Sequence, residues 1–92
     1  MSADAALNEI KRGDDAKRVI ESPVYQEAIE KVREGIIRSM AASPLGDATT
    51  HNKLVIALQL LGQIEKQLVD VMQTGKMAQL QVKDGFVTKF FG

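Results

Sequence analysis

The sequence predicts an all-α protein built around an antiparallel hairpin of two long helices. Apolar residues recur at helical spacing over residues 23–42 and again over residues 48–74. Between these segments, residues 43–47 (SPLGD) form the clearest break, and a link of this length is typical of antiparallel helix pairs. Hydrophobic residues make up 45% of the 92 residues but aromatic residues only 4%, so the core should be aliphatic.

The segment before the hairpin predicts short helices. Ser2 can cap a helix over residues 3–12, and Gly13 is placed to end it. Asp14 and Asp15 then favour the start of a second short helix, because acidic side chains are stabilising at a helix N-terminus.

Capping residues mark the ends of the hairpin helices. Ser22 can accept a hydrogen bond from the first turn of the first long helix, and Pro23 suits the first helical position. Asp47 can cap the second long helix, which we expect over residues 48–74 with Gly75 as its C-cap. The chain is thus expected to form one helical domain, with N-terminal segments in 1–21, the hairpin in 22–75 and a C-terminal arm in 76–92.

The two hairpin helices carry more apolar surface than they can bury against each other. The second helix has a 3–4–3–4 seam, Leu60 widens that seam, and Val55 and Ile56 fall outside it. A two-helix hairpin also buries too little to fold alone, so we expect a homo-oligomer, most simply a dimer that forms a four-helix bundle. The expected oligomer seam consists of Ile29, Val32, Ile36, Leu54, Leu61, Ile64, Leu68 and Val71.

Glu65 is the polar exception within the apolar stripe of the second helix. A carboxylate in such a position costs free energy unless it is paired. We expect Glu65 to set the register by pairing with a basic residue of another helix or subunit, such as Arg33. The alternative is a binding or catalytic acid.

The C-terminal arm allows two interpretations. Residues 77–80 can extend the second helix past Gly75, whereas Asp84-Gly85 between short apolar runs is typical of a β-hairpin. The three Phe residues of the protein all lie in this arm, so we expect Phe86, Phe90 and Phe91 to bind a partner.

Composition argues against most chemistries. Twelve basic and twelve acidic residues give a net charge of zero, which disfavours duplex DNA or an anionic membrane as the main partner. There is no Cys, and the one histidine, His51, lies near a helix start, with Asp47 four residues earlier but no second His and no cluster of carboxylates to complete a metal site. We therefore predict no enzyme activity, no catalytic or metal-binding residue and no cofactor. Lys17, Arg18 and Arg38 are the candidate anion-binding residues.

The run VIESPVYQEAIEKV, the SPLGD link and the closing segment VMQTGKMAQLQ together resemble a group of small helical proteins of tailed bacteriophages and prophages. The resemblance covers about two thirds of the chain and implies a helical hairpin, but it implies no activity and no functional residue. The matching residues are Ser22-Pro23, Glu27-Ala28, Ser43-Pro44, Asp47 and Thr74-Gly75-Lys76.

Three functions follow as hypotheses. The first is a non-catalytic interaction protein of phage origin that binds itself and a phage or host protein, such as a virion-assembly or DNA-packaging accessory. The second is a counter-defence protein that blocks a host factor or sequesters a nucleotide signal between subunits. The third, a nucleic-acid-binding regulator, is the weakest at zero net charge. We expect the cytoplasm of an infected host or the virion as its location, and no membrane partner.

Overall fold

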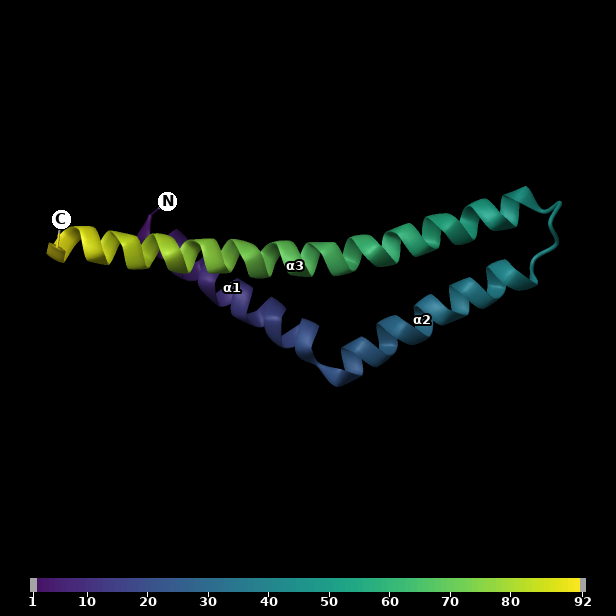
Figure 1. Cartoon of the computed structure of the whole chain (residues 1–92), viewed down its shortest axis with the longest axis horizontal. Helices are drawn as coiled ribbons and strands as arrows, with labels where there is room; N and C mark the ends of the chain where they lie inside the picture. The colour runs from purple at the N-terminus through teal and green to yellow at the C-terminus, as the bar shows by residue number, and fades with distance from the viewer. Residues whose placement is uncertain (1, 92) are drawn as a thin grey trace. The chain divides into compact units, whose positions relative to one another are not determined.

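A computed structural model describes the backbone of residues 2–91 and the side chains of residues 2–84. It confirms the all-α prediction, since the described residues form three helices and no strand. Helix α1 spans Ala3–Glu21, α2 spans Pro23–Ala42 and α3 spans Ala48–Phe91 (Figure 1).

The predicted capping residues begin the three helices. The Ser2 hydroxyl oxygen accepts a hydrogen bond from the Ala5 backbone N–H at 3.1 Å, and the Ser22 hydroxyl accepts one from Tyr25 at 3.3 Å. The Asp47 carboxylate accepts the Thr50 backbone N–H at 3.0 Å. Each of these bonds satisfies a first-turn N–H that has no partner within the helix.

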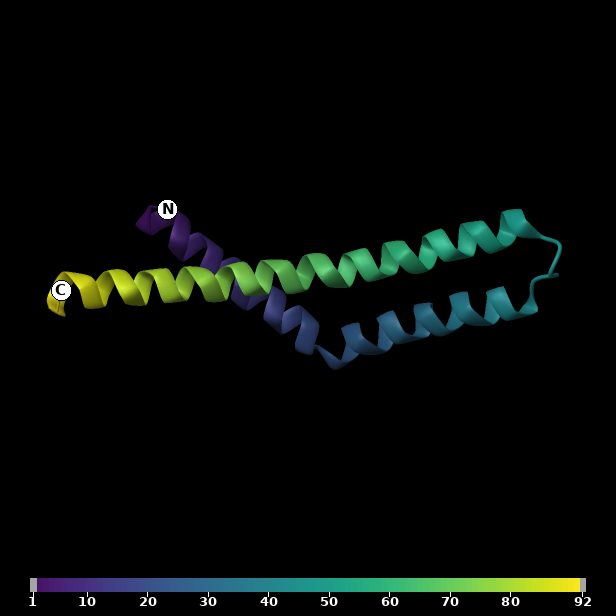
Figure 2. The ribbon, with the colours of Figure 1, turned by 45° about the horizontal axis from the view of Figure 1, so that its top comes forward.

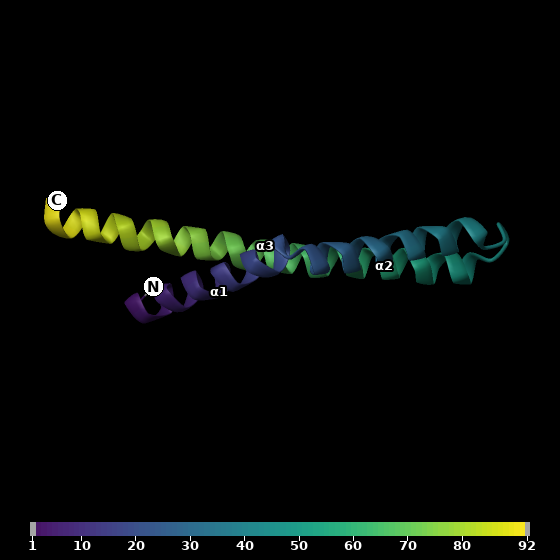
Figure 3. The same ribbon diagram turned by 90° about the horizontal axis from the view of Figure 1, so that it is seen from below.

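The chain divides into two compact units, which we describe separately. Unit 1 combines Met1–Ile20 with Gln67–Gly92, and unit 2 is Glu21–Lys66. In unit 2, α2 and the first part of α3 form the predicted antiparallel hairpin, joined by residues 43–47 (Figure 3). The core of unit 2 is small, since Leu61 is the only buried apolar residue among its described side chains.

Unit 1 shows that the helix break predicted at Gly13 is wrong. Helix α1 is continuous and crosses the C-terminal part of α3 (Figure 2). A Cβ atom added to Gly13 would lie 2.8 Å from the Gly75 Cα, and one added to Gly75 would lie 2.9 Å from the Glu9 carbonyl oxygen. The two helix backbones are therefore in contact, and only glycine allows this approach.

The C-cap predicted at Gly75 is also wrong. Helix α3 continues through Gly75 to Phe91 and is 44 residues long. None of the described glycines has a positive φ, so neither Gly13 nor Gly75 acts as a left-handed helix terminator. The arm over residues 76–91 is helical in backbone, and the β-hairpin interpretation is excluded.

Candidate interaction surfaces

The residues of the predicted oligomer seam separate into covered and exposed groups. Leu61 is buried in unit 2, where Ile29, Ile36 and Leu54 are half-buried. Val32 and Ile64, in contrast, are 51% and 54% exposed. The remaining seam residues, Leu68 and Val71, are half-buried in unit 1. Much of the seam is therefore covered within a single chain, while Val32 and Ile64 remain open for another contact.

Glu65 and Arg33 are brought together in unit 2. The Arg33 guanidinium donates a hydrogen bond from Nη2 to Oε1 of Glu65, and from Nη1 to Oε2 of Glu30 at 3.0 Å. The Arg33 and Glu65 side chains are 31% and 38% exposed, so the pair lies at the edge of the hairpin core and water screens it in part. The contact shows which level of α2 lies opposite which level of α3.

A row of large apolar side chains is exposed along the first part of α3. Ile56, Leu60 and Ile64 are 54%, 59% and 54% exposed and recur every four residues, which places them on one side of the helix. Ile56 lies outside the seam predicted from the sequence, and Leu60 lies at the edge of that seam. Their four-residue spacing is the signal that identifies them as a separate surface.

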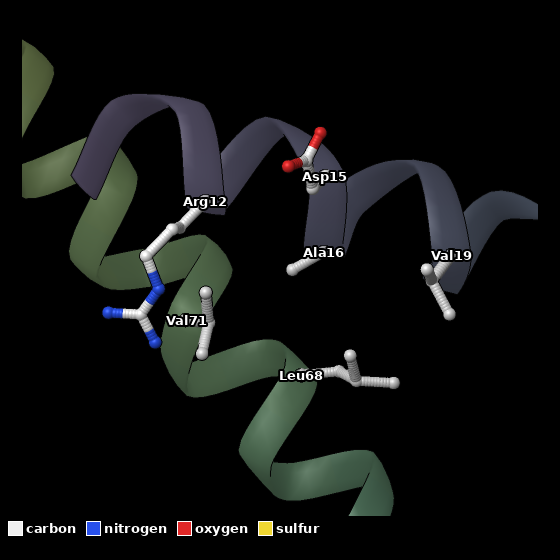
Figure 4. Close-up of a pocket in the computed structure, with 6 residues that line it drawn as sticks. All are labelled: Arg12, Asp15, Ala16, Val19, Leu68 and Val71. Atoms are coloured by element: carbon white, nitrogen blue, oxygen red, sulfur yellow. The ribbon is translucent and has the colours of Figure 1, made fainter. Parts of the chain in front are cut away.

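A shallow hollow of about 270 Å³ lies in unit 1, where α1 meets α3 (Figure 4). Its charged side chains, Arg12 and Asp15, form ion pairs within α1, at 3.0 Å to Glu9 and with Arg18 respectively. Its floor is aliphatic, so it offers room for an apolar side chain and no reactive group. The hollow is lined by Arg12, Asp15, Ala16, Val19, Leu68 and Val71.

The candidate anion-binding residues belong to different units. Lys17 and Arg18 lie on α1 in unit 1, and Arg38 lies on α2 in unit 2. Arg18 is already paired with Asp15. Arg38 is exposed and has no ion pair with any described residue.

Among the described residues, Asp47 at the start of α3 has a pKa that departs from its ordinary value. Hydrogen bonds from the Thr50 hydroxyl, at 2.6 Å, and then from its backbone N–H lower the pKa of Asp47 below its ordinary value of 3.8. The nearby His51 acts in the same direction, and partial desolvation opposes it. His51 Nε2 is buried without a hydrogen-bond partner among the described residues, as is the Tyr25 hydroxyl.

The predicted partner-binding residues Phe86, Phe90 and Phe91 lie outside the described side chains. Within the described part of the chain, no group of three or more acidic, His or Cys side chains is placed to hold a metal ion. Over the same residues, no helix is long and apolar enough to cross a membrane. No protein-family model, curated protein or solved structure matches this chain.

Proposed function

We propose that the chain is a non-catalytic protein–protein interaction protein of a tailed bacteriophage, acting as a virion-assembly or DNA-packaging accessory. The observation that carries this proposal is the imbalance between covered and uncovered apolar side chains. The buried apolar residues are Ala6, Ala16, Leu61 and Ala78, whereas large side chains such as Leu7, Leu60 and Met77 are each more than half exposed. Uncovered apolar surface of this extent is typical of a protein that functions with its surface bound to another protein.

The phage origin rests on the resemblance described above. The residues that carry it have structural roles in this chain: Ser22 and Asp47 cap helices, and Gly75 allows α1 to approach α3. The resemblance thus supports a shared helical framework, and the choice of partner is left to the exposed side chains.

Site-specific photo-crosslinking in phage-infected cells tests the proposal. A photoreactive amino acid at Met77, which is 61% exposed, should trap a discrete phage or host protein. The matched control places the same group at the neighbouring exposed residue Lys76, rotated by about 100° around α3, where trapping should be much weaker. Equal labelling at both positions, or no trapped protein at either, would contradict an interaction role.

The two other hypotheses predict different results with the purified chain. A counter-defence protein that sequesters a nucleotide signal should gain several degrees in Tm with cyclic nucleotides. A nucleic-acid-binding regulator should bind DNA with an affinity that falls steeply as salt rises. We expect neither result, because the net charge of the chain is zero and Arg18 and Arg33 already form ion pairs with carboxylates of the same chain.

A further inference from the structure

We propose that a second copy of this chain covers one face of the unit 2 hairpin, related by a two-fold axis that runs parallel to the hairpin helices. In this arrangement, α3 of each copy packs over α2 of the other. The inference rests on the proposed interaction role and identifies the surface and the partner. The surface, which we call the apolar hairpin face, consists of Val32, Gly35, Ser39, Ile56, Leu60 and Ile64.

Helix geometry places these residues on the same side of the hairpin. Gly35 precedes the half-buried Ile36, and Leu60 precedes the buried Leu61. Gly35 and Leu60 are thus each rotated by about 100° around their own helix axis, in the same sense, from the inward-facing residue that follows them. Because α2 and α3 run antiparallel, equal rotations bring both residues to the same side of the plane that contains the two helices. The Arg33–Glu65 pair is rotated in the opposite sense and lies toward the other side.

The Arg33–Glu65 contact also shows which residues of α2 and α3 lie at the same level along the hairpin. Leu60 lies five residues before Glu65, so it is level with position 38 of α2, between Gly35 and Ser39. The α3 side of the face therefore carries large side chains that are 54–59% exposed, while the α2 side beside Leu60 carries small ones. A Cβ atom added to Gly35 meets nothing within 4 Å. The face consequently has a ridge along α3 and a trough along α2.

A surface that has both a ridge and a trough is complementary to itself. A two-fold axis parallel to the helices keeps the levels and exchanges the helices, so the Leu60 ridge of one copy enters the trough at Gly35 and Ser39 of the other. A two-fold axis perpendicular to the helices would instead place ridge against ridge. None of the six face residues is charged.

The exposed area of the chain leaves room for an interface of this size. The chain exposes 6914 Å² at a mass of 10.1 kDa. A compact monomer of this mass would expose about 5,300 Å². The excess, about 1,600 Å², exceeds the roughly 800 Å² that each partner contributes to a standard stable interface. The large side chains of the apolar hairpin face contribute to this excess, since Val32, Ile56, Leu60 and Ile64 are each more than half exposed.

Gly35→Leu is the decisive variant, and Gly62→Leu is its matched control. Both glycines are helical and have open space where a Cβ would lie, but Gly62 follows Leu61 and is rotated away from the face. Leucine favours helix more than glycine does, so both variants should fold. In sedimentation equilibrium, the wild-type chain and Gly62→Leu should give twice the 10.1 kDa chain mass. Gly35→Leu fills the trough and should weaken dimerisation roughly 100-fold or more.

Disulfide trapping tests the direction of the two-fold axis. Because the chain has no native Cys, only the introduced cysteines can form a disulfide. Chains with Ser39→Cys and chains with Leu60→Cys are mixed under reducing conditions and then oxidised. The mixed disulfide should form, and the Leu60→Cys chain alone should not cross-link to itself. Self-cross-linking of Leu60→Cys without the mixed product would overturn the proposed axis.

A wild-type monomer at high micromolar concentration, or an unchanged dimer in Gly35→Leu, would overturn the proposed interface. These outcomes are separate from failure of the proposed function. A monomer whose Met77 probe still traps another protein would disprove the dimer and leave the interaction role intact. A dimer whose Met77 probe traps no other protein would support the interface between copies and disprove the interaction role with another protein.

Discussion

The two units of this protein pack helices together by opposite means. In unit 1, α1 and α3 approach until their backbones touch at Gly13 and Gly75, and the buried side chains around the contact are alanines. In unit 2, α2 and α3 are separated by aliphatic side chains and joined by the Arg33–Glu65 ion pair. The first contact depends on the absence of side chains, and the second depends on their presence.

This difference predicts where each unit tolerates change. A backbone contact cannot be relieved by choosing another rotamer, so added atoms at the unit 1 crossing force the helices apart. A side-chain contact loses stability mainly when atoms are removed and a cavity is left. Unit 1 should therefore be sensitive to larger residues, and unit 2 to smaller ones.

Gly75→Val should have the largest effect, because its Cβ would lie 2.8 Å from the Gly13 Cα. We expect a loss of about 3 kcal/mol in the free energy of unfolding, the upper end for overpacking. Urea denaturation measures the loss, and hydrogen exchange should show that the amides of α1 lose protection. Gly62→Val on the same helix, where nothing lies within 4 Å, is the control and should change stability little. Similar losses in the two variants would contradict the close crossing.

Leu61→Ala should have the next largest effect. Leu61 is 7% exposed and is the one large apolar side chain that the described part of unit 2 buries. Removing it should cost about 2.5 kcal/mol, which calorimetry or urea denaturation can measure. The control is Ile64→Ala at a side chain that is 54% exposed. If the chain dimerises as proposed, the Ile64→Ala loss should be measurable at high protein concentration and disappear on dilution.

The sequence predicted the helices because their signals are local. Ser2, Ser22 and Asp47 each cap a helix, and a capping side chain needs only the three residues that follow it. Gly13 and Gly75 were interpreted wrongly because a glycine can end a helix or admit a neighbouring backbone. Only the partner helix decides between these roles, and that partner lies far away in the sequence.

The candidate surfaces could be predicted in part for the same reason. The helical position of Glu65 within an apolar stripe indicated a basic partner, and Arg33 meets it in the structure. The apolar hairpin face was missed because it combines residues of two helices whose relative level the sequence does not state. Once Arg33 faces Glu65, the level follows, and Leu60 is level with the turn of α2 between Gly35 and Ser39.

Breaking the Arg33–Glu65 pair should have a smaller effect. Both side chains are about one third exposed, so solvent screens their attraction and a coupling of about 0.5–1 kcal/mol is expected. A double-mutant cycle with Arg33→Met and Glu65→Gln measures this coupling, which should decrease as salt is added. The cycle must account for Glu30, which also binds Arg33. If Glu65→Leu instead raises stability and leaves the assembly unchanged, Glu65 does not set the register.

The charge of the Asp47 cap should have the smallest effect, and that effect should depend on pH. Hydrogen bonds from Thr50 stabilise the ionised carboxylate and lower its pKa below 3.8. The ionised Asp47 carboxylate therefore stabilises the folded state above pH 3.8, and this stabilisation is lost as the pH falls through the lowered pKa of the folded state. Asp47→Asn keeps a capping oxygen without the charge, so its Tm should be lower than that of the wild type at pH 6, and this difference should shrink as the pH is lowered toward 2. Asp47→Ala removes the cap itself and should be destabilised at both pH values. A Tm difference between wild type and Asp47→Asn that is as large at pH 2 as at pH 6 would show that ionisation is not its cause.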